Sequence, residues 1–186
     1  MTPDAPYFDE DAAVLLAREP QPRRALFLDR DGVINIDHGY VHAPAQIEWL
    51  DGIFDLCRAA HAASYLPIVV TNQAGIARGY FGRDQFLALT AWMHARFREQ
   101  GAPLLATYYC PHHPTAGIGP LLADCGCRKP RPGMLLDAAA QFDLQLADSL
   151  LLGDKQSDLQ AADAAGVGRA RLFEGGRLPA FDTLLD

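Results

Sequence analysis

Two aspartates two residues apart, Asp29 and Asp31, are the first feature of the chain that could carry out chemistry. They follow a short apolar run and precede Gly32. Residues i and i+2 of an extended strand point to the same side, so both carboxylates should leave the strand end together. Two like charges this close are costly unless a cation or a proton neutralises one, which favours a Mg²⁺-assisted site. Taken alone, the pair also fits an ordinary strand-to-turn junction.

Two later apolar runs also end in polar residues. One ends at Thr71 and Asn72, and the other ends at Asp154 and Lys155, with Asp158 one helical turn further on. Ligands of open parallel α/β sheets bind at the carboxyl ends of the strands. Three such strand ends therefore indicate a single crevice that binds a ligand.

A basic cluster at Arg128 and Lys129 precedes an expected helix. The chain has 16 basic residues, but lysine occurs only at Lys129 and Lys155. Lysine is a compact point charge and arginine a planar fork, so lysine suits a place where one small cation must meet a phosphoryl oxygen or a carboxylate. The alternative is that these two lysines remain by chance, although both lie in segments already suspected of forming the site.

The four cysteines fall into two groups. Cys57 fits the apolar stripe of a helix and is expected to be a buried free thiol. The other three form the ligand pairs Cys110-x-His112 and Cys125-x-Cys127, separated by a loop rich in Gly and Pro. Three thiolates and one imidazole suit a closed tetrahedral Zn²⁺ site, whereas disulfides are rare in cytosolic proteins.

From the residues alone, His113 could replace His112 as the fourth ligand of this zinc. Because protein groups would fill all four positions, the zinc is expected to be structural rather than catalytic. It would pin a long loop, residues 111–124, that is otherwise costly to order. It would also fix the backbone that presents Arg128 and Lys129.

Apolar runs and helical patterns alternate along the chain. Strands are expected at 25–28, 66–70, 104–109, 150–152 and 170–173, and helices near 52–63, 83–100, 133–141 and 156–165. This alternation predicts right-handed βαβ units and an α/β fold with a doubly wound parallel sheet. The segments between the motifs are too short for an inserted cap domain, so the loops at 37–46 and 111–124 are expected to shape the substrate entrance.

Length and composition suit one domain. With 186 residues, of which 49% are apolar, we assign a single domain to residues 25–186 and an N-terminal extension to residues 1–24, with a short helix near 9–19. The sequence shows neither a long apolar run nor a basic-then-apolar leader, so we expect a cytoplasmic protein without a membrane partner. The formal net charge of −7 argues against nucleic acid as a partner. We expect a monomer.

The order of the motifs resembles that of the haloacid dehalogenase-like phosphohydrolases. The matching motifs are Asp29-Arg30-Asp31-Gly32, Thr71-Asn72-Gln73, Lys129 and Gly153-Asp154-x-x-x-Asp158. The segments 37–41, 71–81, 110–114 and 125–130 are similar to those of the D-glycero-D-manno-heptose 1,7-bisphosphate phosphatases, and the similarity runs from about residue 25 to about residue 173. The chain departs from that family at Ala74, where a serine is expected, and in the extension, which short members lack.

The resemblance implies a Mg²⁺-dependent phosphatase that acts on a phosphorylated sugar, in the synthesis of nucleotide-activated heptose for lipopolysaccharide or surface glycans. Asp29 would be the nucleophile, and Asp31 the general acid and base. Mg²⁺ would be held by Asp29, the backbone carbonyl of Asp31 and Asp154.

The resemblance also implies roles for the remaining polar residues. Thr71, the backbone around Asn72 and Lys129 would bind the oxygens of the transferred phosphate. The candidates for the second phosphate of a bisphosphate are Arg78 and Arg128. Lys155 and Asp158 would orient their neighbours without touching phosphate. For the structural zinc, the resemblance favours the ligand set Cys110, His112, Cys125 and Cys127.

Three alternatives remain open from the sequence. Histidinol-phosphate phosphatase is a close relative within the enzyme class and has the same zinc pattern. A non-enzymatic phospho-acceptor switch also uses an acceptor Asp, a Thr and a Lys around Mg²⁺, but it lacks the second Asp two residues on. A zinc-organised binding module would leave the strand ends at Asp29, Thr71 and Asp154 unexplained. A phosphatase assay with and without Mg²⁺ separates the enzyme from the other two classes.

Overall fold

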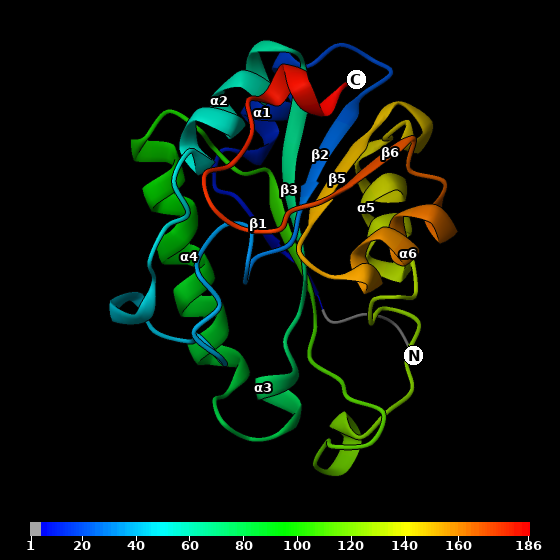
Figure 1. Cartoon of the computed structure of the whole chain (residues 1–186). Helices are drawn as coiled ribbons and strands as arrows, with labels where there is room; N and C mark the ends of the chain where they lie inside the picture. Colours follow the sequence, from blue (N-terminus) through cyan, green and yellow to red (C-terminus); the bar gives the residue numbers. More distant parts are fainter. Residues whose placement is uncertain (1–4) are drawn as a thin grey trace.

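One mostly parallel sheet forms the centre of the molecule (Figure 1). The computed structural model describes residues 5–186, so residues 1–4 of the extension lie outside the described part. The strands are β1 (Tyr7–Phe8), β2 (Arg24–Leu28), β3 (Tyr65–Asn72), β4 (Ala106–Cys110), β5 (Leu150–Gly153) and β6 (Arg169–Leu172). Their order in the sheet is β1-β4-β3-β2-β5-β6. All neighbours pair in parallel except β1, which lies antiparallel to β4 at the edge.

Helices cover both faces of the sheet (Figure 1). The α-helices are α1 (Ala12–Arg18), α2 (Ile53–Ala62), α3 (Ala74–Ala77), α4 (Arg83–Glu99), α5 (Gly133–Phe142) and α6 (Gln156–Ala165). Short 3₁₀ turns lie at Pro44–Gln46, Gly119–Leu121, Leu146–Asp148 and Phe181–Leu184. Helices α2 and α4 pack on one face, and α1, α5 and α6 pack on the other.

The central strand β2 shows why both faces must be covered. Successive strand residues point to opposite sides of a sheet. Accordingly, Leu26 and Leu28 belong to the core on the side of α2 and α4, whereas Ala25 and Phe27 belong to the core on the side of α5 and α6. All four side chains are fully buried. A continuous apolar run of this kind is typical of a parallel strand covered on both faces.

The predicted doubly wound fold is confirmed. Each of the five predicted strands and four predicted long helices is present, with ends displaced by no more than a few residues. Residues 5–186 contain no inserted cap domain, because the segments 29–52 and 111–132 are loops with single 3₁₀ turns. The two-residue strand β1 and the one-turn helix α3 were not predicted, since neither is long enough to show a period. Within the described residues, no helix has the length and apolar character needed to cross a bilayer.

The N-terminal extension is tied to the domain by a buried polar network. Asp9 follows β1, and its Oδ2 accepts hydrogen bonds from His94 Nδ1 at 2.8 Å and Arg98 Nη1 at 2.7 Å. On the other side of its ring, His94 Nε2 lies 2.9 Å from Thr107 Oγ1 of β4. The side chains of Asp9 and His94 are completely buried. The network therefore joins the extension to α4 and to the sheet.

Acid should weaken this network. Burial is the largest cause that lowers the pKa of His94 below its ordinary value of 6.5, and it outweighs the opposing effect of Asp9. Burial would raise the pKa of Asp9, but the hydrogen bonds from His94 and the Asp11 amide, together with nearby positive charge such as that of Arg98, outweigh burial and lower this pKa. The unfolded chain then binds more protons than the folded chain, so stability is lost as the pH falls below the ordinary value of His94, and further below that of Asp9.

We therefore expect the Tm to fall between about pH 7 and about pH 5 in the parent protein, and to fall less in His94→Gln. At neutral pH the variant should lose about 1–3 kcal/mol of the free energy of unfolding, because Asp9 and Thr107 lose a buried partner. His38→Gln is the matched control, since the His38 side chain is half exposed and pairs with the exposed Glu48. Parallel pH curves for parent and His94→Gln would contradict this explanation.

Candidate active site

The carboxyl ends of β2, β3 and β5 meet at one cavity, as their neighbouring positions in the sheet require. Its volume is about 640 Å³. The predicted site residues in its wall are Asp29, Asp31, Thr71, Asn72, Arg128, Lys129, Lys155 and Asp158. A second cavity of about 500 Å³ lies between α2 and the C-terminal 3₁₀ turn, and its wall holds none of the predicted site residues.

Asp29 is held at the end of β2 with one oxygen engaged. Its backbone amide donates to the carbonyl of Leu152, which extends the pairing of β2 with β5 by one residue. Oδ1 accepts a hydrogen bond from the Arg30 amide at 2.7 Å and lies 3.1 Å from Lys129 Nζ. Oδ2 has no such partner in the described part of the chain. Oδ2 is therefore the free oxygen of this carboxylate.

Lys129 is a buried cation between two carboxylates. Its Nζ lies 2.6 Å from Asp158 Oδ1 and 3.1 Å from Asp29 Oδ1, and it donates a hydrogen bond to the carbonyl of Val70 at 2.7 Å. Burial would lower the pKa of Lys129, but the charges of Asp29 and Asp158 outweigh burial and hold the pKa above its ordinary value. Lys129 therefore presents a permanent positive charge beside Asp29.

Asp154 completes a set of three carboxylates with Asp29 and Asp158, whose oxygens lie within 4.8 Å of one another. Burial, reinforced mainly by the charge of Asp29, raises the pKa of Asp154 to about 6. Its Oδ1 is buried and has no hydrogen-bond partner among residues 5–186. Three carboxylates therefore share one buried cation, Lys129, with only the half-exposed Lys155 beside Asp154, so the cluster keeps a net negative charge. These carboxylate oxygens fit a hard divalent cation such as Mg²⁺.

The glycine behind the two aspartates is required by this carboxylate cluster. Gly32 has a φ of +94°, a backbone conformation that L side chains rarely adopt. A Cβ atom at this position would also clash with the carboxylate of Asp154. The sequence Asp-x-Asp-Gly therefore lets the loop after β2 approach Asp154 closely.

Asp31 is placed differently from the expectation for an extended strand, because β2 ends at Leu28 and the chain turns at Arg30. Its carboxylate accepts hydrogen bonds from the Arg30 guanidinium, from Asn35 Nδ2 at 3.1 Å and from Gln73 Nε2 at 3.2 Å. It still lines the same cavity as Asp29. Both carboxylates thus face one space, but they are held by separate groups.

Two polar residues at the end of β3 act on their neighbours. The side chain of Asn72 accepts a hydrogen bond from the Lys129 amide at 3.1 Å and donates one to the Lys129 carbonyl at 3.0 Å. Gln73 Nε2 lies 2.9 Å from Thr71 Oγ1, so one amide group contacts both Thr71 and Asp31. No role was predicted for Gln73 or Arg30, since their partners cannot be found from spacing alone.

The other predicted residues lie around this centre. Asp158 Oδ2 accepts a hydrogen bond from the Lys155 amide at 2.9 Å at the start of α6. Lys155 Nζ is half exposed and lies 3.4 Å from both Asp154 and Asp37. Arg128 lines the cavity, whereas Arg78 is not part of the cavity wall. Asp158 and Lys155 thus contact other polar groups around the site, and Arg128 has the access to the cavity that Arg78 lacks.

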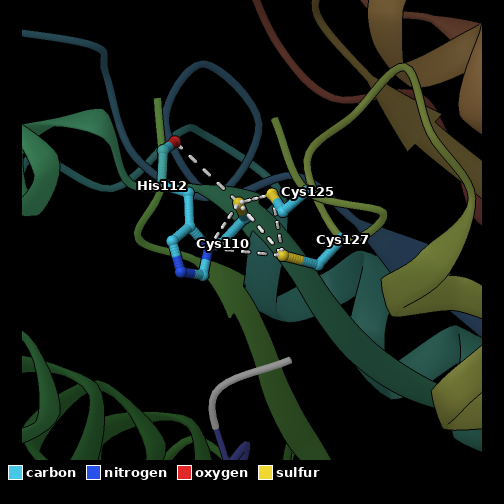
Figure 2. Close-up of side chains that lie close together, drawn as sticks. All are labelled: Cys110, His112, Cys125 and Cys127. Atoms are coloured by element: carbon cyan, nitrogen blue, oxygen red, sulfur yellow. Dashed lines mark hydrogen bonds between the residues drawn. The ribbon is translucent and has the colours of Figure 1, made fainter. Parts of the chain in front are cut away.

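The four predicted zinc ligands come together in one buried cluster (Figure 2). The three sulfur atoms are 3.2–3.4 Å apart, and His112 Nδ1 lies 3.7–3.8 Å from Cys110 and Cys127. A Zn–S distance of about 2.3 Å corresponds to edges of about 3.8 Å in a tetrahedron, so the four ligands fit a zinc ion after small shifts.

The environment of the thiols also favours metal binding. Hydrogen bonding with Cys110 is the largest cause that lowers the pKa of Cys127 to about 5. The same hydrogen bond raises the pKa of Cys110, so one thiolate, that of Cys127, forms readily in this buried cluster, and thiolates are the form that binds zinc. His113, the alternative ligand, points elsewhere: its Nδ1 accepts hydrogen bonds from the amides of Thr115 and Ala116.

Several known proteins are similar to this chain in sequence and in fold. The HAD-hydrolase-like family model matches residues 126–172. A Burkholderia mallei protein named D-glycero-alpha-D-manno-heptose-1,7-bisphosphate 7-phosphatase is 56% identical over 150 residues, which cover 81% of this chain and 79% of the relative. A Vibrio cholerae protein named D-glycero-beta-D-manno-heptose-1,7-bisphosphate 7-phosphatase is 47% identical over 153 residues, which cover 82% of each chain.

A solved structure from B. bronchiseptica is described as a D,D-heptose 1.7-bisphosphate phosphatase complexed with magnesium and phosphate. It is 36% identical to this chain, covers 78% of each chain and has a TM-score of 0.69. The doubly wound sheet and its strand-end carboxylates define a haloacid dehalogenase-like phosphohydrolase. More narrowly, the chain belongs to the D-glycero-D-manno-heptose-1,7-bisphosphate 7-phosphatase family. The family predicted from the motifs is confirmed.

Proposed function

We propose that this protein removes the 7-phosphate of D-glycero-D-manno-heptose 1,7-bisphosphate, through a phosphorylated aspartate. The observation that carries the proposal is the grouping of Asp29 with Lys129 in the cavity wall and with Asp154, which has a carboxylate oxygen within 4.8 Å of one of Asp29. This grouping combines a nucleophile, a cation site and a fixed positive charge. The activity named for the relatives supports the choice of substrate. The product would supply nucleotide-activated heptose for surface glycans, and the reaction would take place in the cytoplasm.

The chain's own residues account for each chemical step. Asp29 Oδ2 attacks phosphorus, and the bond between phosphorus and the sugar oxygen breaks as Asp31 donates a proton to that oxygen. Asp31 then takes a proton from a water molecule, which attacks phosphorus and releases Asp29. Thr71, the backbone around Asn72 and Lys129 bind the phosphoryl oxygens and stabilise the charge that develops on them.

Asp29, Asp154 and the backbone carbonyl of Asp31 would hold the Mg²⁺ ion. When bound, it neutralises charge on the phosphoryl group and orients it for in-line attack. Asp158 orients Lys129 through their ion pair, and Lys155 extends from the start of α6 toward Asp154. We assign both residues to orienting their neighbours rather than to binding phosphate.

Cys110, His112, Cys125 and Cys127 would hold a structural Zn²⁺ ion. Its place in the chain supports this role, because Arg128 and Lys129 follow directly after Cys127. Arg131 donates a hydrogen bond to the carbonyl of Cys125 at 2.9 Å and thereby links the cluster to the start of α5. Zinc would therefore fix the backbone that places the phosphate-binding cations.

Arg128 is the residue that we assign to the second phosphate of the substrate. It lines the cavity, and among the ion pairs of residues 5–186 it has no carboxylate partner. Its Nη1 donates only to the carbonyl of His112, at 3.2 Å. A free guanidinium can bind a phosphate bidentately. Arg78 is the weaker candidate, because it does not line the cavity.

Arg128→Ala should lower kcat/KM for the heptose bisphosphate about 10- to 100-fold, because a charge-assisted hydrogen bond to phosphate contributes about 1.5–3 kcal/mol. The loss with p-nitrophenyl phosphate, which has one phosphate, should stay within about threefold. Phosphate release measured with both substrates checks this result. Equal losses on both would show that Arg128 does not bind the second phosphate.

Histidinol phosphate tests the choice of substrate. It carries no second phosphate, and its ammonium group would meet Arg128 and Lys129 in the same cavity, so its kcat/KM should be far lower than that of the bisphosphate. Equal or better activity on histidinol phosphate would assign the protein to the alternative member of the enzyme class. Activity on any of the three substrates with Mg²⁺, and none without it, would exclude a binding module.

A further inference from the structure

We propose that Arg30 is a positioning residue that holds the carboxylate of Asp31 for proton transfer and couples its position to the entrance loop, which we define as residues 37–46. The inference rests on the proposed function, because it assumes that Asp31 is the general acid and base. Arg30 itself would not touch the substrate.

The guanidinium of Arg30 is almost entirely committed to Asp31. Its Nε and Nη2 donate hydrogen bonds to Asp31 Oδ1 at 3.0 Å and 2.7 Å, and Nη2 also contacts Oδ2. The Arg30 side chain is only 2% exposed, and among the described residues Asp31 is its only ion-pair partner. The buried Nη1 has no hydrogen-bond partner in the same part of the chain. Burying a guanidinium with one nitrogen unsatisfied is costly, so packing alone does not explain Arg30. Its hydrogen bonds to the Asp31 carboxylate do.

The same guanidinium reaches the entrance loop. Nη2 donates a hydrogen bond to the carbonyl of Val41 at 2.8 Å, and the guanidinium lies 5.9 Å from the ring of Phe86 in α4. Three other loop residues, Asp37, Gly39 and Tyr40, line the substrate cavity. One nitrogen atom therefore contacts both the proposed general acid and the loop that a substrate must meet.

The geometry has a consequence for the first chemical step. A proton passes efficiently from Asp31 to the leaving oxygen only if the carboxyl group is held close to that oxygen and well aligned with it. Arginine holds both Asp31 oxygens and the loop carbonyl because its donors form a rigid fork, and lysine offers only a point charge. Replacing Arg30 should therefore impair proton donation more than it impairs substrate binding.

Leaving groups of different basicity separate these two effects. p-Nitrophenolate leaves without a proton, whereas phenolate is more basic and needs one, and the two aryl phosphates have nearly the same size. The quantity to measure is kcat/KM, because it reports only the steps up to release of the first product. We expect Arg30→Lys to lower kcat/KM for phenyl phosphate about tenfold more than for p-nitrophenyl phosphate. An excess below about threefold would overturn the proposal.

Two further variants identify the cause. In an Asp31→Asn background, Arg30→Lys should no longer change the ratio of the two kcat/KM values, because a positioning residue acts only through its partner. Arg24→Lys is the matched control. Arg24 lies at the other end of β2, donates to the carbonyl of Ala63 at 2.8 Å and stacks on the ring of Tyr65. A change of the ratio in Arg24→Lys, or in the Asp31→Asn background, would overturn the proposal.

Arg30→Met keeps most of the length of the side chain but removes every donor to Asp31, so it provides the same test if Arg30→Lys does not fold. The failure of this inference differs from the failure of the proposed function. A parent enzyme that is active on aryl phosphates and on the heptose bisphosphate, with an unchanged ratio in the Arg30 variants, contradicts only the role of Arg30. A parent enzyme that releases no phosphate from any of them with Mg²⁺ contradicts the proposed function.

Discussion

Asp29→Asn should abolish phosphatase turnover while leaving the fold intact. The amide keeps the shape of the carboxylate, and Oδ1 can still accept the hydrogen bond from the Arg30 amide. The oxygen that would attack phosphorus is lost as a nucleophile, so we expect a loss of at least about a thousandfold in kcat, which corresponds to about 4 kcal/mol in the barrier. Steady-state phosphate release with the heptose bisphosphate measures this loss. The Tm should change little, which separates a chemical defect from unfolding.

Asp31→Asn is the matched comparison, since it changes the same functional group two residues away. It should slow both the formation and the hydrolysis of the phosphorylated aspartate without removing the nucleophile. Rapid acid quench after labelling with p-nitrophenyl phosphate should therefore trap phosphate on Asp31→Asn and not on Asp29→Asn. If Asp29→Asn keeps activity within about tenfold of the parent, or if it is labelled, covalent catalysis by Asp29 is wrong.

The fold could be predicted because each main strand is a continuous apolar run. Phe27 and Leu28 in β2, like Leu151 and Leu152 in β5, are buried on opposite faces of the sheet, so the runs have no polar positions. The polar residues that follow such runs mark the strand ends, and in a parallel sheet those ends meet. Strand β1 could not be predicted in this way, because only two of its residues pair with β4 and no period can be recognised in so short a segment.

The sequence was enough to predict which residues form the site, but not which of them contact one another. Asp29 and Lys129 are 100 positions apart, and only the sheet order brings them together. The pairing of Asn72 with the backbone of Lys129 leaves no mark in local spacing. Arg30 was missed for a different reason: neighbouring side chains of a strand point to opposite sides, whereas here the chain turns and Arg30 bonds the carboxylate that follows it.

Cys125→Ser should remove zinc and strongly destabilise the protein. Structural zinc sites in peptides contribute apparent binding free energies of about 10–16 kcal/mol, and much of this energy is coupled to folding. The thiol lies 3.4 Å from the Cys110 sulfur and 3.2 Å from the Cys127 sulfur, so serine would leave an incomplete set of ligands. We expect the zinc content to fall from about one ion per chain to nearly none, with a large drop in Tm. Metal analysis and thermal denaturation measure the two effects.

Cys57→Ser is the control that the chain itself provides. Cys57 is also a fully buried free thiol, but it lies in α2 within the core on the side of α2 and α4, and it belongs to no ligand cluster among the described residues. This variant should lose only about 1–3 kcal/mol, for burying a hydroxyl, and should keep its zinc. Because Cys127 directly precedes Arg128 and Lys129, loss of zinc should also raise KM for the bisphosphate, whereas Cys57→Ser should leave KM unchanged.

Brief EDTA treatment followed by Mg²⁺ should restore activity as long as zinc stays bound. Freshly purified, active protein without zinc would show that the four ligands hold the loop unaided.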